Sequence, residues 1–248
     1  MTGAGQHGDL HVVAVPAFQD NYIWLVHDTT SGETAVVDPG DAAPVLAEAE
    51  RRGWTLGQVL NTHWHPDHTG GNLAVKEAMS STISGPAAEK ERTPGVDRLL
   101  KDGDTVRIGN NTGDVIEVPG HTLGHVAYVF REAGIAFVGD TMFVMGCGRL
   151  FEGTPAQMNA SLQRIAALPP ETVLYCAHEY SLSNARFAAH AFPDDAAIAS
   201  RLEQIEQARA EGRSTVPTTV AEERATNPFL RARDNDHFAE LRAAKDRF

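Results

Sequence analysis

THWHPDH, residues 62–68, lies between an apolar run and the pair Gly70–Gly71. Its metal-binding side chains are His63, His65, Asp67 and His68. Four such groups in so short a loop would compete for protons unless a cation held them. A solvated histidine-rich loop is the alternative, but Pro66 stiffens this loop and apolar strands flank it. The stretch therefore predicts a metal site at the end of a buried strand.

The first half of the chain has the pattern of short strands joined by loops. Runs of β-branched and aromatic residues bounded by turn residues occur at 10–16, 21–26, 34–38, 56–62, 105–108, 114–120, 126–130 and 135–140. Helices are expected at 41–53 and 70–79. Asp41 is a suitable N-cap for the first of these helices, and Gly53 can end it.

The second half changes character. One more strand is expected at 172–178, and no further strand is expected after Ser181. Apolar residues at helical spacing predict helices at 154–168, 194–212 and about 236–247. The chain is therefore expected to be an α/β protein with two domains, a catalytic domain at 1–179 and a helical domain at 180–248.

Composition narrows the class of function. The 248 residues carry a formal net charge of -12, which disfavours nucleic acid and anionic membranes as partners. The N-terminal residues have no basic or apolar region of the kind found in signal peptides, so no secretory signal is expected, and no apolar run approaches the roughly 20 residues of a membrane helix. Cys147 and Cys176 do not suggest a disulfide scaffold. We expect a cytoplasmic protein without a membrane or nucleic-acid partner.

Further potential ligands follow other predicted strands, namely His121, Asp140 and His178. Alone, His121 could be a hydrogen-bonded loop residue, Asp140 a turn or cap residue, and His178 a partner of Glu179. Strand ends meet at one edge of a sheet, however, so these side chains are expected to converge with the motif at 62–68.

The combined ligand set points to two ions. It contains imidazole and carboxylate but no thiolate, which suits Zn, Fe or Mn. It is too large for one tetrahedral ion and fits two divalent ions with a bridging carboxylate. The remaining histidines are expected at the surface or around the ligands: His7, His11, His27, His125, His190 and His237.

These residues resemble a known family, glyoxalase II (the hydroxyacylglutathione hydrolases), within the metallo-β-lactamase fold superfamily. The metal motif is common to the superfamily. The narrower likeness rests on PAFQDNYIWLV, VVDPG, NTHWHPDHTGGN, VPGHTLGH, GDTMFVMGCGRLFEGT, YCAHEY, NPFLR and RAAKDRF, in that order. It runs from about residue 10 to Phe248 and includes the helical segment.

The resemblance implies a four-layer αββα sandwich followed by a helical domain. It also implies how the ligands divide between the ions. The first ion would be held by His63, His65 and His121, and the second by Asp67, His68 and His178, with Asp140 bridging. Asp38 would orient a ligand histidine, although it could equally be a turn residue before Pro39.

The activity implied is hydrolysis of S-D-lactoylglutathione and related 2-hydroxyacylglutathiones to D-lactate and glutathione, the second step of methylglyoxal detoxification. Hydroxide held between the ions would attack the thioester carbonyl, and Asp67 could take the proton of the attacking water. The leaving thiolate has a pKa of roughly 8–9, so no dedicated general acid is required.

Substrate binding is expected to involve Arg149, Tyr180, Arg242 and Lys245. Arg242 and Lys245 share a helix face, which Phe238, Leu241 and Phe248 could dock on the core. By pattern alone that segment could be a solvated helix end. The family often has Tyr where Phe151 stands, so affinity for glutathione is the property that this difference puts in question.

Two alternatives remain at the level of sequence. One is a dioxygenase of the same superfamily that acts on glutathione persulfide with a single iron. The other is a non-catalytic metal-binding or redox module that uses the two cysteines. A β-lactamase has no use for the helical domain or the basic pair. A monomer is expected, and the identity of the metals stays open.

Overall fold

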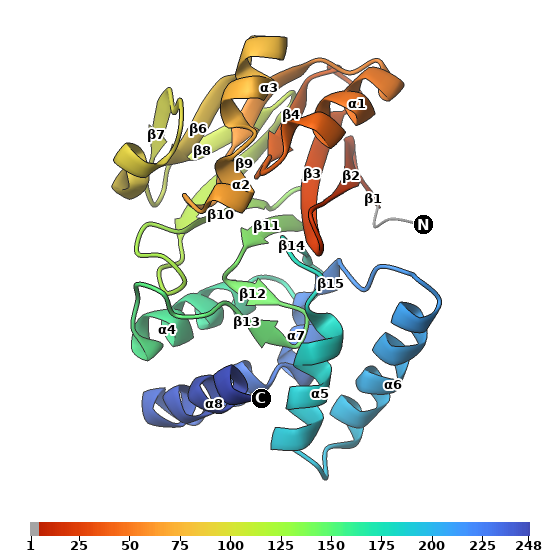
Figure 1. Cartoon of the computed structure of the whole chain (residues 1–248), viewed down its shortest axis with the longest axis vertical. Helices are drawn as coiled ribbons and strands as arrows, with labels where there is room; N and C mark the ends of the chain where they lie inside the picture. The colour runs from red at the N-terminus through yellow and green to blue at the C-terminus, as the bar shows by residue number, and fades with distance from the viewer. Residues whose placement is uncertain (1–4) are drawn as a thin grey trace.

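The computed structural model describes residues 5–248, and its first sheet follows chain order (Figure 1). Within that range the strands, in spatial order, are β1 (Gly5–His7), β2 (Leu10–Ala17), β3 (Asn21–Asp28), β4 (Thr34–Val37), β5 (Leu56–Leu60), β6 (Thr82–Pro86) and β7 (Arg98–Leu100). Pairing is antiparallel from β1 to β4 and parallel from β4 to β7.

The second sheet is mixed in the same way. Its spatial order is β15 (Thr218–Thr219), β14 (Val173–Cys176), β11 (Ile135–Gly139), β10 (Val126–Phe130), β9 (Asn111–Glu117) and β8 (Thr105–Ile108). β11 and β14 are parallel, and the other neighbours are antiparallel. A short hairpin of β12 (Met142–Phe143) and β13 (Gly146–Cys147) follows β11.

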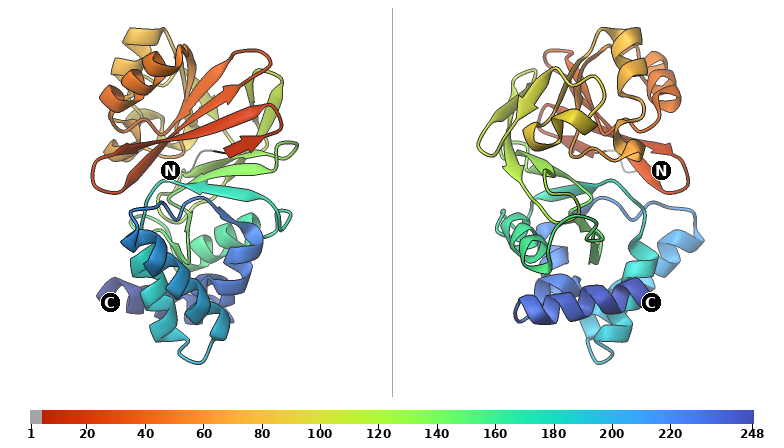
Figure 2. Two further views of the ribbon diagram at one scale, coloured as in Figure 1. Left: turned by 90° about the vertical axis from the view of Figure 1, so that its right-hand side faces the viewer. Right: turned by 60° about the vertical axis from the view of Figure 1, so that its left-hand side comes forward.

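The side chains of β2 alternate between two apolar clusters, one on each face of the first sheet. Leu10 and Val12 belong to the apolar cluster shared with the second sheet, whereas Val13 and Val15 belong to a separate cluster. That second cluster includes residues of α1 (Ala42–Arg52) and α3 (Asn72–Met79), the helices that cover the outer face of the first sheet (Figure 2). Successive side chains of a strand point to opposite faces, so a strand buried on both sides is apolar throughout.

Helices also cover the far side of the second sheet. α4 (Pro155–Ala166) begins at a capping box in which Thr154 and Gln157 bond reciprocally. Its buried Met158, Leu162 and Ile165 join the central core. The layers are therefore helices, sheet, sheet and helices. The remaining helices are η1 (Ala87–Arg92), α5 (Ser181–Ala191), α6 (Ala196–Ala210), α7 (Val220–Thr226), η2 (Pro228–Arg231) and α8 (Asn235–Arg247).

Several expectations from the sequence are confirmed in detail. α1 begins with Asp41 as N-cap, which accepts from the backbone N–H of Ala43, and it ends at Gly53 in the left-handed conformation with φ 69°. The predicted α/β sandwich followed by helices is the observed arrangement. In residues 5–248 no helix is long and apolar enough to cross a membrane.

Other expectations need correction. β9 ends at Glu117, so 118–120 leave the sheet and His121 lies in a loop. A strand does occur after Ser181, because β15 pairs with β14 at the sheet edge. Two residues are too few for periodicity to reveal such a strand. β6, β7 and α5 were also not expected.

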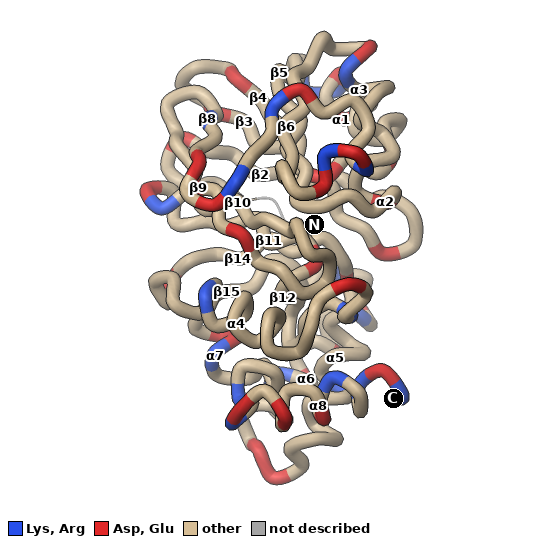
Figure 3. The backbone as a smooth tube through the Cα atoms, turned by 90° about the vertical axis from the view of Figure 1, so that its left-hand side faces the viewer, with Lys and Arg blue, Asp and Glu red and all other residues tan. Residues whose placement is uncertain are grey.

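The ends of α8 differ from expectation in one respect. Phe238 and Leu241 are buried as predicted, but Phe248 is 58% exposed, although its ring contacts those of Phe187 and His190. Figure 3 shows Lys and Arg interspersed with Asp and Glu along this helix. The helix is therefore docked through its middle, and its basic side chains lie near its end.

Candidate metal centre and substrate pocket

The motif at 62–68 begins where β5 leaves the first sheet, and the loop after β4 holds it. The carboxylate of Asp38 accepts the backbone N–H of Thr62 at 2.7 Å and the Thr62 hydroxyl at 2.6 Å. Gly40 packs so tightly that a Cβ would lie 1.8 Å from the carbonyl oxygen of Asp67. α2 (Pro66–Thr69) then carries the rest of the motif. Close backbone packing thus fixes the motif before any ion is considered.

Residues from the second sheet reach the same place. Asp140 follows β11 directly, and its Oδ2 lies 3.3 Å from Nε2 of His121 and 3.4 Å from Nε2 of His178. Its Oδ1 lies 3.4 Å from Nε2 of His68. Nε2 of His121 lies 3.0 Å from Nδ1 of His65. The structure therefore brings together every side chain proposed as a ligand from the sequence, with Asp140 between the two groups.

In the first group, hydrogen bonds behind the rings fix the tautomers. The Thr62 hydroxyl gives its proton to Asp38, so at 3.1 Å it can only accept from Nδ1 of His63. The carbonyl of Arg149 likewise accepts from Nδ1 of His121 at 2.9 Å. Both Nε2 atoms are then unprotonated, and each lies 3.0 Å from Nδ1 of His65. Converging ring nitrogens of this kind are suited to a metal ion.

In the second group, carboxylates lie behind both rings. Nδ1 of His178 donates to Oδ1 of Asp20 at 2.8 Å, and Nδ1 of His68 lies 3.1 Å from Oδ2 of Asp38. The opposite nitrogens face Oδ2 of Asp67, at 3.5 Å from His178 and 3.4 Å from His68. Imidazoles backed by carboxylates are a common arrangement at metal sites.

Burial and charge set different protonation states in the two groups. Burial lowers the pKa of His63 well below its usual range, and lowers that of His65 to about 4. Burial alone would raise the pKa of Asp140, but His178 and His68 hold it well below its usual range. Burial opposes the charge on His68, yet Asp140 and Asp38 raise its pKa well above the ordinary value. Burial therefore favours neutral imidazoles in the first group, whereas the carboxylates of the second group favour a cation beside them.

The donor set fits divalent ions. In the described part of the chain, the buried atoms Nε2 of His68 and Oδ1 of Asp140 have no hydrogen-bond partner. Orphaned buried polar atoms are rare, and here they face each other across 3.4 Å. Ligand atoms gather within 4.8 Å of one another in two groups that match the proposed division, His63–His65–His121 and Asp67–His68–His178. A third such group, Asp38 with His63 and His68, has its carboxylate already bonded to Thr62.

A cavity of about 530 Å³ opens beside this cluster. Its lining residues are His65, Asp67, His121, Asp140, Phe143, Cys147, Arg149, Phe151, His178, Tyr180, Ser183, Asn184, Arg242, Lys245, Asp246 and Phe248. One end of the cavity is therefore formed by the candidate ligands, and another part by the basic residues of α8. The size suits a small peptide-like ligand.

The basic pair of α8 is anchored to the elements around the cavity. Arg242 is buried and donates to the carbonyl of Cys147 at 2.9 Å and to Asp246 at 2.8 Å. Lys245 donates to the hydroxyl of Ser183 at 2.6 Å. Burial lowers the pKa of the Lys245 ammonium to about 8. Arg242 thus acts partly as a structural tie, whereas Lys245 can exchange its partner for a ligand.

The other predicted substrate contacts lie on the cavity wall. The Tyr180 ring stacks on His178 with centroids 4.7 Å apart. Arg149 is exposed, with its Nε 3.8 Å from Asp246. Phe151 is 62% exposed and sets its ring edge against His65 and His121. Phe151 therefore presents an apolar surface at the mouth of the cavity.

The cysteines do not form a redox pair in this structure. Cys147 and Cys176 are both free and buried. Burial raises the pKa of the Cys147 thiol to about 11, which leaves it protonated and unreactive at neutral pH. This geometry gives no support to a redox module built on these residues.

Some residues around the site could not be assigned from the sequence. His125, expected at the surface or around the ligands, is fully buried: its ring stacks on His63, and its Nε2 accepts the backbone N–H of Asp140 at 3.1 Å. Asp20 and Asn21 contact His178 and Asp67 from a hairpin turn. Their sequence signals were a polar turn between two apolar strands and their place in the stretch PAFQDNYIWLV.

Comparison with known proteins agrees with this geometry. Residues 17–178 match the family described as "Metallo-beta-lactamase superfamily", and residues 179–248 match "Hydroxyacylglutathione hydrolase C-terminus". The chain is 51% identical to the hydroxyacylglutathione hydrolase of Erythrobacter litoralis over 251 residues, which covers 96% of this chain and 100% of the relative. It is 48% identical to the protein of that name from Methylococcus capsulatus, with 96% and 99% covered.

A solved structure shows the same fold at lower identity. ETHE1 from Myxococcus xanthus superposes with a TM-score of 0.68 at 24% identity, covering 92% of this chain and 90% of that one. The two matched families and the full-length relatives show that the chain belongs to the hydroxyacylglutathione hydrolases (glyoxalase II) of the metallo-β-lactamase superfamily.

Proposed function

We propose that the protein hydrolyses S-D-lactoylglutathione and related 2-hydroxyacylglutathiones to the free hydroxy acid and glutathione. The observation that carries this proposal is the cavity that places the His/Asp cluster and the basic residues of α8 on the walls of one space. A glutathione thioester is anionic at its peptide end and electrophilic at its carbonyl. Such a molecule matches a cavity with cations on one wall and metal ligands on another.

The ligand set supports two divalent ions, with zinc preferred and iron or manganese as alternatives. His63, His65 and His121 would hold one ion, Asp67, His68 and His178 the other, and Asp140 would lie between them. Cys147 and Cys176 contribute no thiolate, because both are buried thiols. Ions bound there would polarise a carbonyl oxygen and lower the pKa of an adjacent water.

A side chain of the protein would accept the proton that the attacking water loses. Burial alone would raise the pKa of Asp67, but His68 and the amide of Asn21 keep it below its ordinary value. An ionised Asp67 can accept the proton of an attacking water. The leaving thiol has a pKa of roughly 8–9, so its thiolate can depart without a protonated side chain beside it.

Lys245, Arg242, Arg149 and Tyr180 would bind glutathione. Lys245 is the strongest candidate for the carboxylate contact, because its present partner, Ser183, is neutral and easily exchanged. Arg242 would act mainly by holding the β13 backbone in place. Phe151 would offer contact area but no hydroxyl, so the hydrogen bonds to the glutathione backbone would come from the other side chains.

We further propose two domains with a boundary after residue 179. The domain at 1–179 contains the metal ligands, and the domain at 180–248 contains the basic glutathione contacts of α8. A monomer can carry the whole site, because a single chain supplies every group named above. The buried free cysteines fit a reducing compartment such as the cytoplasm.

The decisive experiment pairs elemental analysis with turnover. Purified protein is expected to hold close to two metal ions per chain and to hydrolyse S-D-lactoylglutathione, with loss of activity after chelation. A single iron together with oxygen consumption on glutathione persulfide would favour the dioxygenase instead. Absence of bound metal, or metal without thioester hydrolysis, would contradict the proposal.

A further inference from the structure

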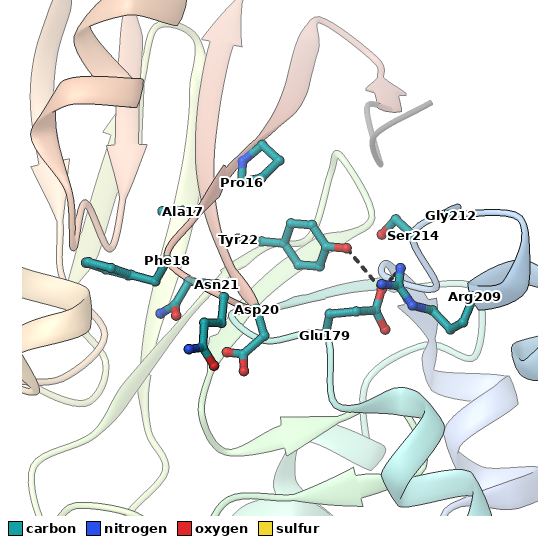
Figure 4. A pocket seen from close by; sticks show the side chains of 11 residues that line it. Pro16, Ala17, Phe18, Asp20, Asn21, Tyr22, Glu179, Arg209, Gly212 and Ser214 are labelled. Carbon is teal, nitrogen blue, oxygen red and sulfur yellow. Dashed lines mark hydrogen bonds and ion pairs between the residues drawn. The ribbon is translucent and has the colours of Figure 1, made fainter.

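The turn between β2 and β3 lies directly behind the second group of candidate ligands. Ala17 pairs with Asn21 at the end of the hairpin, which leaves 18–20 as its turn. The turn also lines a separate cavity of about 320 Å³, whose other walls include Glu179 and Arg209 (Figure 4). The turn thus has one side toward the candidate ligands and the other toward this cavity.

Asp20 bonds to the rear nitrogen of His178. Its Oδ1 accepts from Nδ1 at 2.8 Å, and the opposite nitrogen, Nε2, lies 3.4 Å from Asp140 and 3.5 Å from Asp67. A neutral imidazole carries one N–H, so a carboxylate at Nδ1 leaves the lone pair of Nε2 free to bind a metal. The backbone secures this contact, because the carbonyl of Asp20 accepts the N–H of Glu179 at 2.9 Å.

Asn21 performs the matching task for Asp67. Its side-chain amide donates to Oδ2 of Asp67 at 3.1 Å. The side chain of Asp67 is 42% exposed, so packing alone does not fix its carboxylate. Asn21 itself is buried and forms an isolated bridge with His178. Two adjacent residues, Asp20 at the end of the turn and Asn21 at the start of β3, therefore contact two candidate ligands of the same group.

The first group has no such support from this turn. Its rear contacts are the Thr62 hydroxyl on His63 and the Arg149 carbonyl on His121, which are neutral and come from other loops. Substitution of Asp20 or Asn21 should therefore change the metal affinity of the second ligand group and leave that of the first unchanged.

We propose that Asp20 and Asn21 are positioning residues for the second metal ion, acting through His178 and Asp67. This inference rests on the proposed function, since it takes the two groups as the binding sites of two ions. Removing a carboxylate or amide behind a ligand typically weakens metal binding about 10- to 100-fold. The loss is expected for one ion only.

The test uses metal-free protein titrated with zinc against a chromophoric chelator, which yields a binding constant for each ion. Asp20→Ala and Asn21→Ala should weaken the second constant about 10- to 100-fold and leave the first unchanged. Asp20→Asn, which keeps an acceptor but loses the charge, should give a smaller effect. Asp20 lines the 320 Å³ cavity, so its truncation leaves no void in the core.

Asp9→Asn is the matched control, because Asp9 is an exposed residue of the neighbouring hairpin turn, and its substitution should change neither constant. The melting temperature of each metal-free variant should equal that of the wild type, which separates positioning from loss of fold. Two unchanged constants in Asp20→Ala and Asn21→Ala, or equal weakening of both, would overturn the inference alone. Wild-type protein that binds fewer than two zinc ions would overturn the proposed function as well.

Discussion

Oδ2 of Asp38 lies 3.1 Å from Nδ1 of His68 while accepting the Thr62 hydroxyl at 2.6 Å. Asp38 also has a positive φ of 53°, a conformation that Asp and Asn tolerate better than other residues with a Cβ. One residue in an uncommon backbone conformation therefore contacts both Thr62 and His68 of the motif.

Asp38→Asn should weaken zinc binding about 10- to 100-fold, because the amide keeps the shape and the backbone conformation but loses the charge behind His68. Competition with a chelator measures this affinity. Asp41→Asn, three residues away, is the matched control, since Asn is an equally good N-cap for α1. Equal affinity in Asp38→Asn and wild type would show that this charge does not act on the ion.

Lys245→Ala should raise KM for the glutathione thioester about tenfold or more and lower kcat much less. A hydrogen bond to a charged group contributes about 1.5–3 kcal/mol, and here it would be made equally in the ground and transition states. Steady-state kinetics separate the two constants. Arg242→Ala should also raise KM, but with a lower melting temperature, because Arg242 is buried against Cys147. An unchanged KM in both variants would contradict the binding role.

The pH dependence of KM should follow Lys245. Burial lowers its pKa to about 8, so the ammonium is charged at pH 7 and largely neutral at pH 9. The KM for an anionic thioester is therefore expected to rise across this interval as the cation disappears. In Lys245→Arg the guanidinium stays charged, so the rise should be absent. A rise of the same size in both proteins would assign the titration to another group.

Glu223 should be the most sensitive position for stability in the helical part of the chain. It is fully buried, pairs with Arg201 at 2.9 Å, and accepts the backbone N–H of Met145 at 2.8 Å. Glu223→Ala leaves the largely buried Arg201 without this partner and should cost about 3–5 kcal/mol of unfolding free energy. Denaturant titration measures it, with Glu203→Ala on the exposed side of α6 as the control. Equal loss in both variants would contradict this reading of the pair.

Chelation should lower the melting temperature as well as the activity. Each proposed ligand group takes residues from both sheets, for example His63 after β5 and His121 after β9. Ions bound to the folded chain alone stabilise it in proportion to the logarithm of their free concentration. Calorimetry with buffered zinc should show this dependence. A melting temperature that is independent of zinc would contradict ions shared between the sheets.

The sequence predicted those parts of the site that are encoded locally. The motif at 62–68 and the polar residues after apolar strands are short-range signals, and the sheets do bring them together. The two ends of α1 could also be predicted, because Asp41 and Gly53 act on the adjacent backbone.

What the sequence could not give depends on tertiary contact. Asp20 meets His178 across 158 positions, and no local pattern marks that pairing. β15 is a strand only because β14 offers an edge to pair with. The apolar side chain of Phe248 suggested that it could dock α8 on the core, yet it is 58% exposed and contacts Phe187 and His190 with only part of its surface.

The hairpin of β12 and β13 begins just after Asp140 and ends at Cys147, whose carbonyl meets Arg242. These few residues set the span between the centre of the cluster and the basic end of the cavity. Insertion or deletion in 141–147 would alter that span even though the ligands and the basic residues themselves were unchanged. The length of the hairpin therefore limits which thioesters can contact the metal ligands and the basic residues of the cavity at the same time.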